Sequence, residues 1–162
     1  MQSLIPFAEK VGEILLARRQ TVAISESSSG GLISAALLSV SGASRFYRGS
    51  GIIYTPHAFR GLMGLTKEDL GDMRSSSEPY ALLIARTIRE KLRADWGLCE
   101  TGAAGPSGNG YGDPAGHNCV GIIGGTPIIE HSNTLETGRS DRVENMYAFA
   151  KFALSELLEQ LT

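Results

Sequence analysis

The chain has 162 residues with a formal net charge of −2, from 15 Lys and Arg against 17 Asp and Glu. Hydrophobic residues make up 42% of it and charged residues 20%, the values of an ordinary globular protein, which exclude a disordered or coiled-coil chain. A chain of this length is expected to form one domain over residues 1–162. The near-balanced charge gives no general electrostatic field that would attract a phosphate backbone, so we expect no nucleic-acid partner. No apolar run reaches membrane-span length, so we expect no membrane partner.

The first half of the chain alternates helix and strand patterns. Apolar residues at three- and four-residue spacing predict an amphipathic first helix, and the short β-rich run after it predicts a strand. Pro56 should end a second strand, and residues 46–48 are candidates to extend its start. The predicted helices cover residues 4–19, 32–40 and 57–63, and the predicted strands cover residues 21–25 and 51–54.

The second half continues this alternation. Residues 66–69 have the pattern of a short capped helix, and Ser77-Glu78-Pro79 opens a longer helix that should end near Arg93. Strands are predicted at residues 96–101, 118–123 and 128–135, a Gly-rich loop at 102–116, and a last helix from Ser140 or Asp141. The order of elements predicts an α/β fold, a three-layer α/β/α sandwich around a mixed, mostly parallel sheet with one antiparallel hairpin at the last two strands.

The cysteine count and the N-terminal segment bear on location. Cys99 and Cys119 are the only cysteines and lie in apolar, strand-like runs, so we expect buried free thiols in a reducing compartment. Glu9 and Lys10 lie within the first turns and no basic segment precedes an apolar run, which predicts that no signal peptide is present. These features predict a cytoplasmic protein.

The first Gly-rich loop, residues 26–31, reads Glu-Ser-Ser-Ser-Gly-Gly between a predicted strand and a predicted helix. In open α/β sheets ligands bind at the carboxyl ends of strands, and free amides at a helix start stabilise anions. The loop therefore suits a phosphate or a nucleophilic serine, although a Ser-rich helix cap explains the same pattern. No Lys follows Gly30-Gly31, so the loop is not a Walker motif.

A second loop, residues 101–108, is built from small residues that let a ligand approach the backbone closely. His117 and Cys119 lie two residues apart on one face of a predicted strand, but no third and fourth ligands follow at zinc-like spacing. We therefore predict no metal site. His57 and His131 are single histidines, and a surface or structural position is the default for each.

Taken together, five ordered segments resemble the CinA C-terminal domain family, also known as the nicotinamide-nucleotide amidase family. The resemblance covers nearly the whole chain. It implies an α/β/α sandwich, a homo-oligomer, no metal or organic cofactor, and hydrolysis of the carboxamide of nicotinamide mononucleotide to nicotinate mononucleotide and ammonia. The segments are residues 26–31, where the family reads E-S-C-T-G-G, then 51–54, 77–79, 101–106 and 120–121.

The resemblance assigns the nucleophile but not the base. Ser27 corresponds to the first serine of E-S-C-T-G-G, which is the family's proposed nucleophile. The family's proposed base is the Lys of a Y-S-N-E-A-K segment, and this chain has Phe59 at that position. Arg60 is permanently protonated, so His57 is the nearby residue whose chemistry suits a base, although a helix would turn it about 200° from position 59.

Three functions therefore stay open. The first is an amidohydrolase of a pyridine nucleotide in which Ser27, Tyr54 and His57 are catalytic and Ser29 and Gly30 hold the oxyanion. The second is a catalytically silent relative that binds a nucleotide-like small molecule, and the third is a protein for a different ligand whose pocket is reshaped by the aromatic face of Phe59. The predicted substrate-binding residues are Glu26, Ser28, Ser29, Gly30, Gly31, Thr101, Gly102, Ala104, Gly105 and Arg139, with Arg142 as a second candidate for a phosphate contact.

Overall fold

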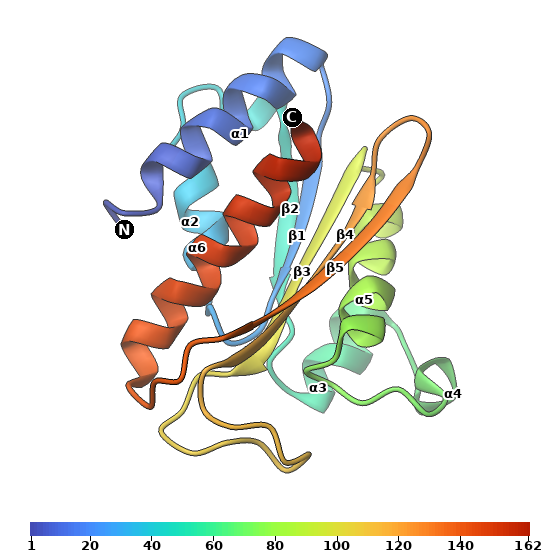
Figure 1. The fold of residues 1–162 in the computed structure, drawn as a ribbon. Coiled ribbons are helices and arrows are strands. Elements are labelled where there is room, and N and C mark those ends of the chain that lie inside the picture. Colours follow the sequence, from blue (N-terminus) through green and yellow to red (C-terminus); the bar gives the residue numbers. More distant parts are fainter.

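The computed structural model describes residues 1–162 and contains one five-stranded sheet between two layers of helices (Figure 1). The strands lie in the order β2-β1-β3-β4-β5; the first two pairings are parallel and the last two antiparallel. Only β4 therefore runs against the other strands, which confirms the mixed, mostly parallel sheet. The strands are β1 (Val22–Glu26), β2 (Tyr47–Ile52), β3 (Trp96–Ala103), β4 (His117–Gly124) and β5 (Ile129–Glu136).

Helices cover both faces of the sheet, which confirms the predicted three layers (Figure 1). One layer consists of α1 (Ile5–Arg18), α2 (Leu32–Leu38) and α6 (Arg142–Leu161). The other contains α5 (Glu78–Lys91) with the short helices α3 (Pro56–Ala58) and α4 (Lys67–Leu70). A 3-10 turn at Ala43–Arg45 precedes β2, and a π-helical turn at Phe59–Met63 follows α3. None of the helices combines the length and apolar character needed to cross a bilayer.

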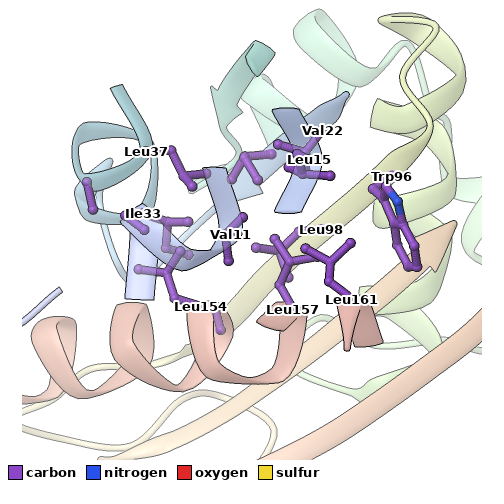
Figure 2. Close-up of a cluster of buried hydrophobic side chains, with 14 of the residues drawn as sticks. Val11, Leu15, Val22, Ile33, Leu37, Trp96, Leu98, Leu154, Leu157 and Leu161 are labelled. Atoms are coloured by element: carbon purple, nitrogen blue, oxygen red, sulfur yellow. The ribbon is translucent and has the colours of Figure 1, made fainter. Parts of the chain in front are cut away.

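The larger hydrophobic core lies between the sheet and α1, α2 and α6 (Figure 2). Burying each large side chain there stabilises the fold by about 1.5–3 kcal/mol relative to leaving it exposed. The helical periodicity seen in the sequence is what brings these side chains to one face of each helix. The labelled members of this core are Val11, Leu15, Val22, Ile33, Leu37, Trp96, Leu98, Leu154, Leu157 and Leu161.

The smaller core lies beneath α5, and two glycines of the sheet let this helix approach closely. A Cβ at Gly97 would lie 2.1 Å from the carbonyl oxygen of Ala85. A Cβ at Gly121 would lie 2.4 Å from the carbonyl carbon of Ala81. Helix α5 therefore packs with its backbone against β3 and β4, and this contact places Tyr80 beside the carboxyl ends of the parallel strands.

The observed bounds differ from the predicted ones mainly at strand ends. Strand β2 begins at Tyr47, which pairs with Val22 of β1, so the extension at residues 46–48 is largely part of the strand. Strand β3 continues through Ala103, because Gly102 and Ala103 pair with β4 although these small residues had predicted a loop. Cys99 and Cys119 are buried free thiols, as expected.

The carboxyl ends of β1, β2 and β3 meet at one edge of the sheet (Figure 1). The connections that leave this edge are residues 27–31, residues 53–55 and the long loop at 104–116. Segments far apart in the sequence are therefore brought together where a ligand of an α/β sheet is expected.

Candidate functional site

A pocket of about 330 Å³ opens at this edge of the sheet. Its volume falls within the range of roughly 300–1,000 Å³ that is usual for small-molecule sites. Hydroxyl groups and aromatic rings predominate in its wall, and no Lys, Arg, His, Asp or Glu is among its lining residues. The lining consists of Ser27, Ile53, Tyr54, Thr55, Pro56, Phe59, Leu70, Ser75, Ser76, Tyr80, Thr101, Gly102 and Tyr111.

Ser27, the predicted nucleophile, lies at the pocket surface directly after β1. Its amide donates a hydrogen bond to Oε2 of Glu100 at 2.9 Å. Its hydroxyl makes no hydrogen bond within the chain, although the carboxyl of Glu100 lies beside the same residue. The structure thus places the nucleophile in the pocket without a base hydrogen-bonded to its hydroxyl.

Glu26 was predicted to contact substrate, but its carboxyl lies below the pocket and is almost fully buried. Its Oε2 accepts from the amides of Gly31 and Ile33 at 2.9 and 3.1 Å. Its Oε1 accepts from both the amide and the hydroxyl of Ser34 at 2.8 and 2.5 Å. The structure therefore gives Glu26 a structural task, which is to satisfy the free amides at the start of α2. The amide of Gly31, a predicted substrate-binding residue, is therefore engaged by Glu26.

The amides predicted to form an oxyanion site are already used within the chain. The amide of Ser29 donates to Oε2 of Glu100 at 2.9 Å, and that of Gly30 donates to the carbonyl of Ser27 at 3.2 Å. The hydroxyl of Ser28 donates to the carbonyl of Gly102 at 2.6 Å, which fixes the two loops to each other. The Glu100 carboxyl and the Ser27 carbonyl thus already accept from these two amides.

Three residues of the Tyr54–Phe59 segment are placed very differently. Tyr54 lines the mouth of the pocket and Phe59 lines its wall, where the ring of Phe59 stacks on that of Tyr80 with centroids 6.2 Å apart. His57 is exposed and outside the lining, since the short helix after Pro56 turns it away from position 59. The structure does not bring His57 to Ser27, so the predicted catalytic trio is not assembled.

Comparison with known proteins identifies the family. A model of the CinA C-terminal domain matches residues 5–161. This chain belongs to the CinA C-terminal domain family. A CinA-like protein of Gloeothece citriformis is 33% identical over 151 residues, which are 93% of this chain and 36% of that relative. A CinA-like protein of Chlorobium limicola is 34% identical over 152 residues, 91% of this chain and 35% of the relative. The chain thus spans about a third of the length of these curated relatives.

Solved structures of the CinA superfamily share this fold. The Klebsiella pneumoniae superfamily protein matches with a TM-score of 0.88 at 24% identity, covering 98% of this chain and 97% of that one. The competence/damage inducible protein of Agrobacterium tumefaciens matches with a TM-score of 0.84 at 27% identity, covering 98% and 94%. These names refer to competence and damage and specify no substrate. The likeness confirms the family and the sandwich that the sequence predicted.

The second loop of this CinA-family chain contributes to the site in two ways. Thr101 and Gly102 line the pocket, whereas Ala104 and Gly105 act through their carbonyls. Nδ2 of the buried Asn145 donates to the Ala104 carbonyl at 2.8 Å, so the first turn of α6 holds the loop in place. The sequence offered no sign of this role, because an asparagine near a helix start usually reads as a surface residue.

Arg139 and Arg142, the two candidates for a phosphate contact, lie in different positions near the start of α6. The guanidinium of Arg142 donates to the hydroxyl of Tyr54 at 2.8 Å and to the carbonyl of Gly105 at 2.5 Å. Arg139 is largely exposed, and its nearest charged partner is Glu144 at 4.0 Å. Arg142, rather than the predicted Arg139, therefore supplies the positive charge at the pocket mouth.

His117 supports the wall opposite Ser27. Its Nε2 lies 2.9 Å from the carbonyl oxygen of Ser76, a pocket residue, and its Nδ1 is hydrogen-bonded to Glu136. Donation from both ring nitrogens requires the imidazolium form. Burial alone would lower the pKa of His117, but the hydrogen bonds to Glu136 and Ser76 and the charge of Asp113 outweigh it and raise the pKa. Cys119 Sγ lies 3.5 Å from the same Nε2, and no group of three metal-ligating side chains is present.

Raising the pH is expected to weaken this wall. The folded-state pKa of His117 lies above the unfolded value near 6.5, so the stabilisation is complete below that pH and is lost as the pH rises through the raised pKa. Over this interval the wild type should lose about 1 kcal/mol more unfolding free energy than His117→Gln, which carries no titrating ring. Urea unfolding of both proteins at a series of pH values measures the difference. Parallel stability curves for the two proteins would contradict the imidazolium assignment.

Proposed function

We propose that this CinA-family chain binds a pyridine-nucleotide-like small molecule in the pocket and does not carry out Ser/Lys amide hydrolysis there. One observation supports this most directly. Ser27 lines the pocket with no base hydrogen-bonded to its hydroxyl, and Phe59 stands at the position of the family's lysine. The proposed ligand is thus of the class that the family's amidases act on, but the proposed function does not include amide hydrolysis.

The lining favours a flat, aromatic ligand with a polar end. The rings of Phe59 and Tyr80 in the wall offer aromatic faces, which attract a cationic ring such as pyridinium. The ring of Tyr111 is already engaged by the guanidinium of Arg74, which lies 5.4 Å from its centroid. Ser27 and Thr101 also line the pocket, and their hydroxyls suit a carboxamide. At the mouth, the guanidinium beside Tyr54 suits a phosphate.

A narrow crevice continues below the pocket and adds a further polar group. Its lining includes Ser25, Ser27, Thr101 and Glu100. The hydroxyl of Ser25 is buried there without a hydrogen-bond partner. Leaving such a group unpaired costs about 1–3 kcal/mol. The crevice is too narrow to admit a water molecule, so a ligand in the pocket does not reach this hydroxyl.

The chemical step of an amidase lacks two of its requirements in this arrangement. A serine hydroxyl is a weak nucleophile until an adjacent base takes its proton. The developing oxyanion also needs free donors, and the amides of Ser29 and Gly30 are engaged within the chain. Both arguments support binding without turnover.

Hydrolysis of nicotinamide mononucleotide is the second candidate, and it rests on the free Ser27 hydroxyl at the pocket surface. Two assays on the same protein test the two candidates. Calorimetry measures the binding of nicotinamide mononucleotide, and an assay of ammonia release measures its hydrolysis. We expect the wild type to bind the nucleotide and to release no more ammonia than Ser27→Ala. Phe59→Lys restores the family's base but leaves the Ser29 and Gly30 amides engaged, so we expect any ammonia release that it gains to be small and to depend on Ser27.

Two results would overturn the proposal. Ammonia release by the wild type that disappears in Ser27→Ala would establish the hydrolase, and His57→Ala would then test the exposed histidine as its base. Failure of the wild type to bind the nucleotide at all would instead exclude the ligand class. The matched control is Arg60→Lys, which places a lysine one residue away from position 59 at an exposed site and should gain no activity.

A further inference from the structure

Two buried carboxyls lie beneath the Ser27 loop and are joined through one hydroxyl. Glu26 and Glu100 are 1% and 0% exposed. The Oγ of Ser29 lies 2.7 Å from Oε2 of Glu26 and also 2.7 Å from Oε2 of Glu100. Neither carboxyl forms an ion pair with a lysine, arginine or histidine. Two uncompensated negative charges in this position would be strongly unfavourable.

The hydroxyl of Ser29 has a single hydrogen, so it can donate to only one of the two carboxyls. It therefore cannot satisfy two ionised carboxyls at once. We infer that Glu26 and Glu100 hold one proton between them at neutral pH, and that Glu100 carries it.

The assignment of the proton to Glu100 follows from the other partners of the two groups. Besides the Ser29 hydroxyl, Glu26 accepts four hydrogen bonds, from the amides of Gly31, Ile33 and Ser34 and the hydroxyl of Ser34. Glu100 accepts three, from the amides of Ser27 and Ser29 and from Asn118. The amides that donate to Glu26 lie at the start of α2, where negative charge is favoured.

Glu100 lies in an environment that favours the neutral form. Burial raises its pKa, and the negative charge of Glu26 raises it further, against the opposing hydrogen bonds from Ser29 and Ser27. The other titratable groups that line the crevice are Cys99 and Tyr80, and burial raises the pKa of each, so both are neutral. No positive charge offsets the effect of Glu26.

The shared proton gives Glu100 a positioning role for the site. Its Oε2 accepts from the amides of both Ser27 and Ser29, so the orientation of the Ser27 loop depends on this side chain. Its Oε1 accepts from Nδ2 of Asn118 at 2.6 Å, which fixes the carboxyl to β4. Loss of the proton would place a second charge beside Glu26 and disturb the loop. This inference concerns the protein alone and does not depend on the identity of the ligand.

Nuclear magnetic resonance of protein labelled with ¹³C at the glutamate carboxyl tests the inference directly. We expect one glutamate resonance at the position of a protonated carboxyl at neutral pH and its disappearance in Glu100→Gln. In Glu26→Gln, if it folds, the same resonance should titrate at lower pH, because a neighbouring charge has been removed. If every glutamate resonance has titrated by neutral pH, or the protonated signal survives in Glu100→Gln, the inference is wrong.

A stability measurement gives a second, independent readout. The folded-state pKa of Glu100 lies above the unfolded value near 4.3, so its stabilisation is present below that pH and is lost as the pH rises toward the folded value. We expect Glu100→Gln, whose neutral amide resembles the protonated carboxyl in shape, to fold and to lack this decline. A purely structural glutamate that is ionised in the fold would show the opposite slope in the wild type.

Discussion

Gly121→Ala is expected to lower the free energy of unfolding by about 3 kcal/mol, because a single methyl group would overlap the backbone of α5. The added Cβ would lie 2.4 Å from the carbonyl carbon of Ala81 and 2.6 Å from both the Ala81 oxygen and the Leu82 nitrogen. Backbone atoms cannot rotate away as a flexible side chain can, so the helix itself must shift. A loss of this size is a large part of the stability of roughly 5–15 kcal/mol that is usual for a domain.

The shift would also reach the pocket, since Tyr80 precedes Ala81 on α5 and lines the wall. Urea unfolding gives the change in stability, and Gly110→Ala is the matched control. No heavy atom lies within 4 Å of a Cβ at Gly110, so that variant should stay within about 0.5 kcal/mol of the wild type. A Gly121→Ala protein as stable as this control would contradict the close packing of α5 on β4.

The order of helices and strands could be predicted because it depends on local periodicity. The stripes of α5 and α6 are spaced for one buried face, and the strand-like run around Gly121 is bounded by turn residues. Which helix covers Gly121 is a tertiary contact between segments about 40 residues apart, and sequence spacing gives no information about it. The extension of β3 through Ala103 was missed for a similar reason, since pairing with β4 overrides the loop character of small residues.

The location of the candidate site was predictable, but the roles of several residues were not. A loop after a strand of a parallel sheet leads to the ligand edge, which placed Ser27 and Thr101 correctly in one pocket. Glu26 was expected to face the ligand because it adjoins Ser27, whereas the pleat of β1 turns it toward α2. Glu100 is an isolated acid in an apolar strand, and its partners in the Ser27 loop lie more than 70 residues away in the sequence.

Arg142→Ala is expected to weaken the binding of nicotinamide mononucleotide about 10- to 100-fold, if the nucleotide occupies the pocket as proposed. The guanidinium of Arg142 uses two of its N–H groups on Gly105 and Tyr54, and its other N–H groups are free for phosphate oxygens at the mouth. Because the side chain lies at the exposed edge, its loss should leave the fold intact. Calorimetric titration of the wild type and the variant measures the effect.

The phosphate itself supplies the decisive control for this prediction. Nicotinamide riboside has the same ring, carboxamide and sugar but no phosphate, so its affinity should hardly change in Arg142→Ala. Arg139→Ala removes an equal charge from the same end of α6, yet Arg139 lies near Glu144 rather than at Tyr54, and we expect at most a twofold loss for the nucleotide. Equal losses of affinity in the two arginine variants would mean that the positive charge acts at long range. Equal losses of affinity for the two ligands in Arg142→Ala would mean that Arg142 shapes the mouth through Tyr54 instead of binding phosphate.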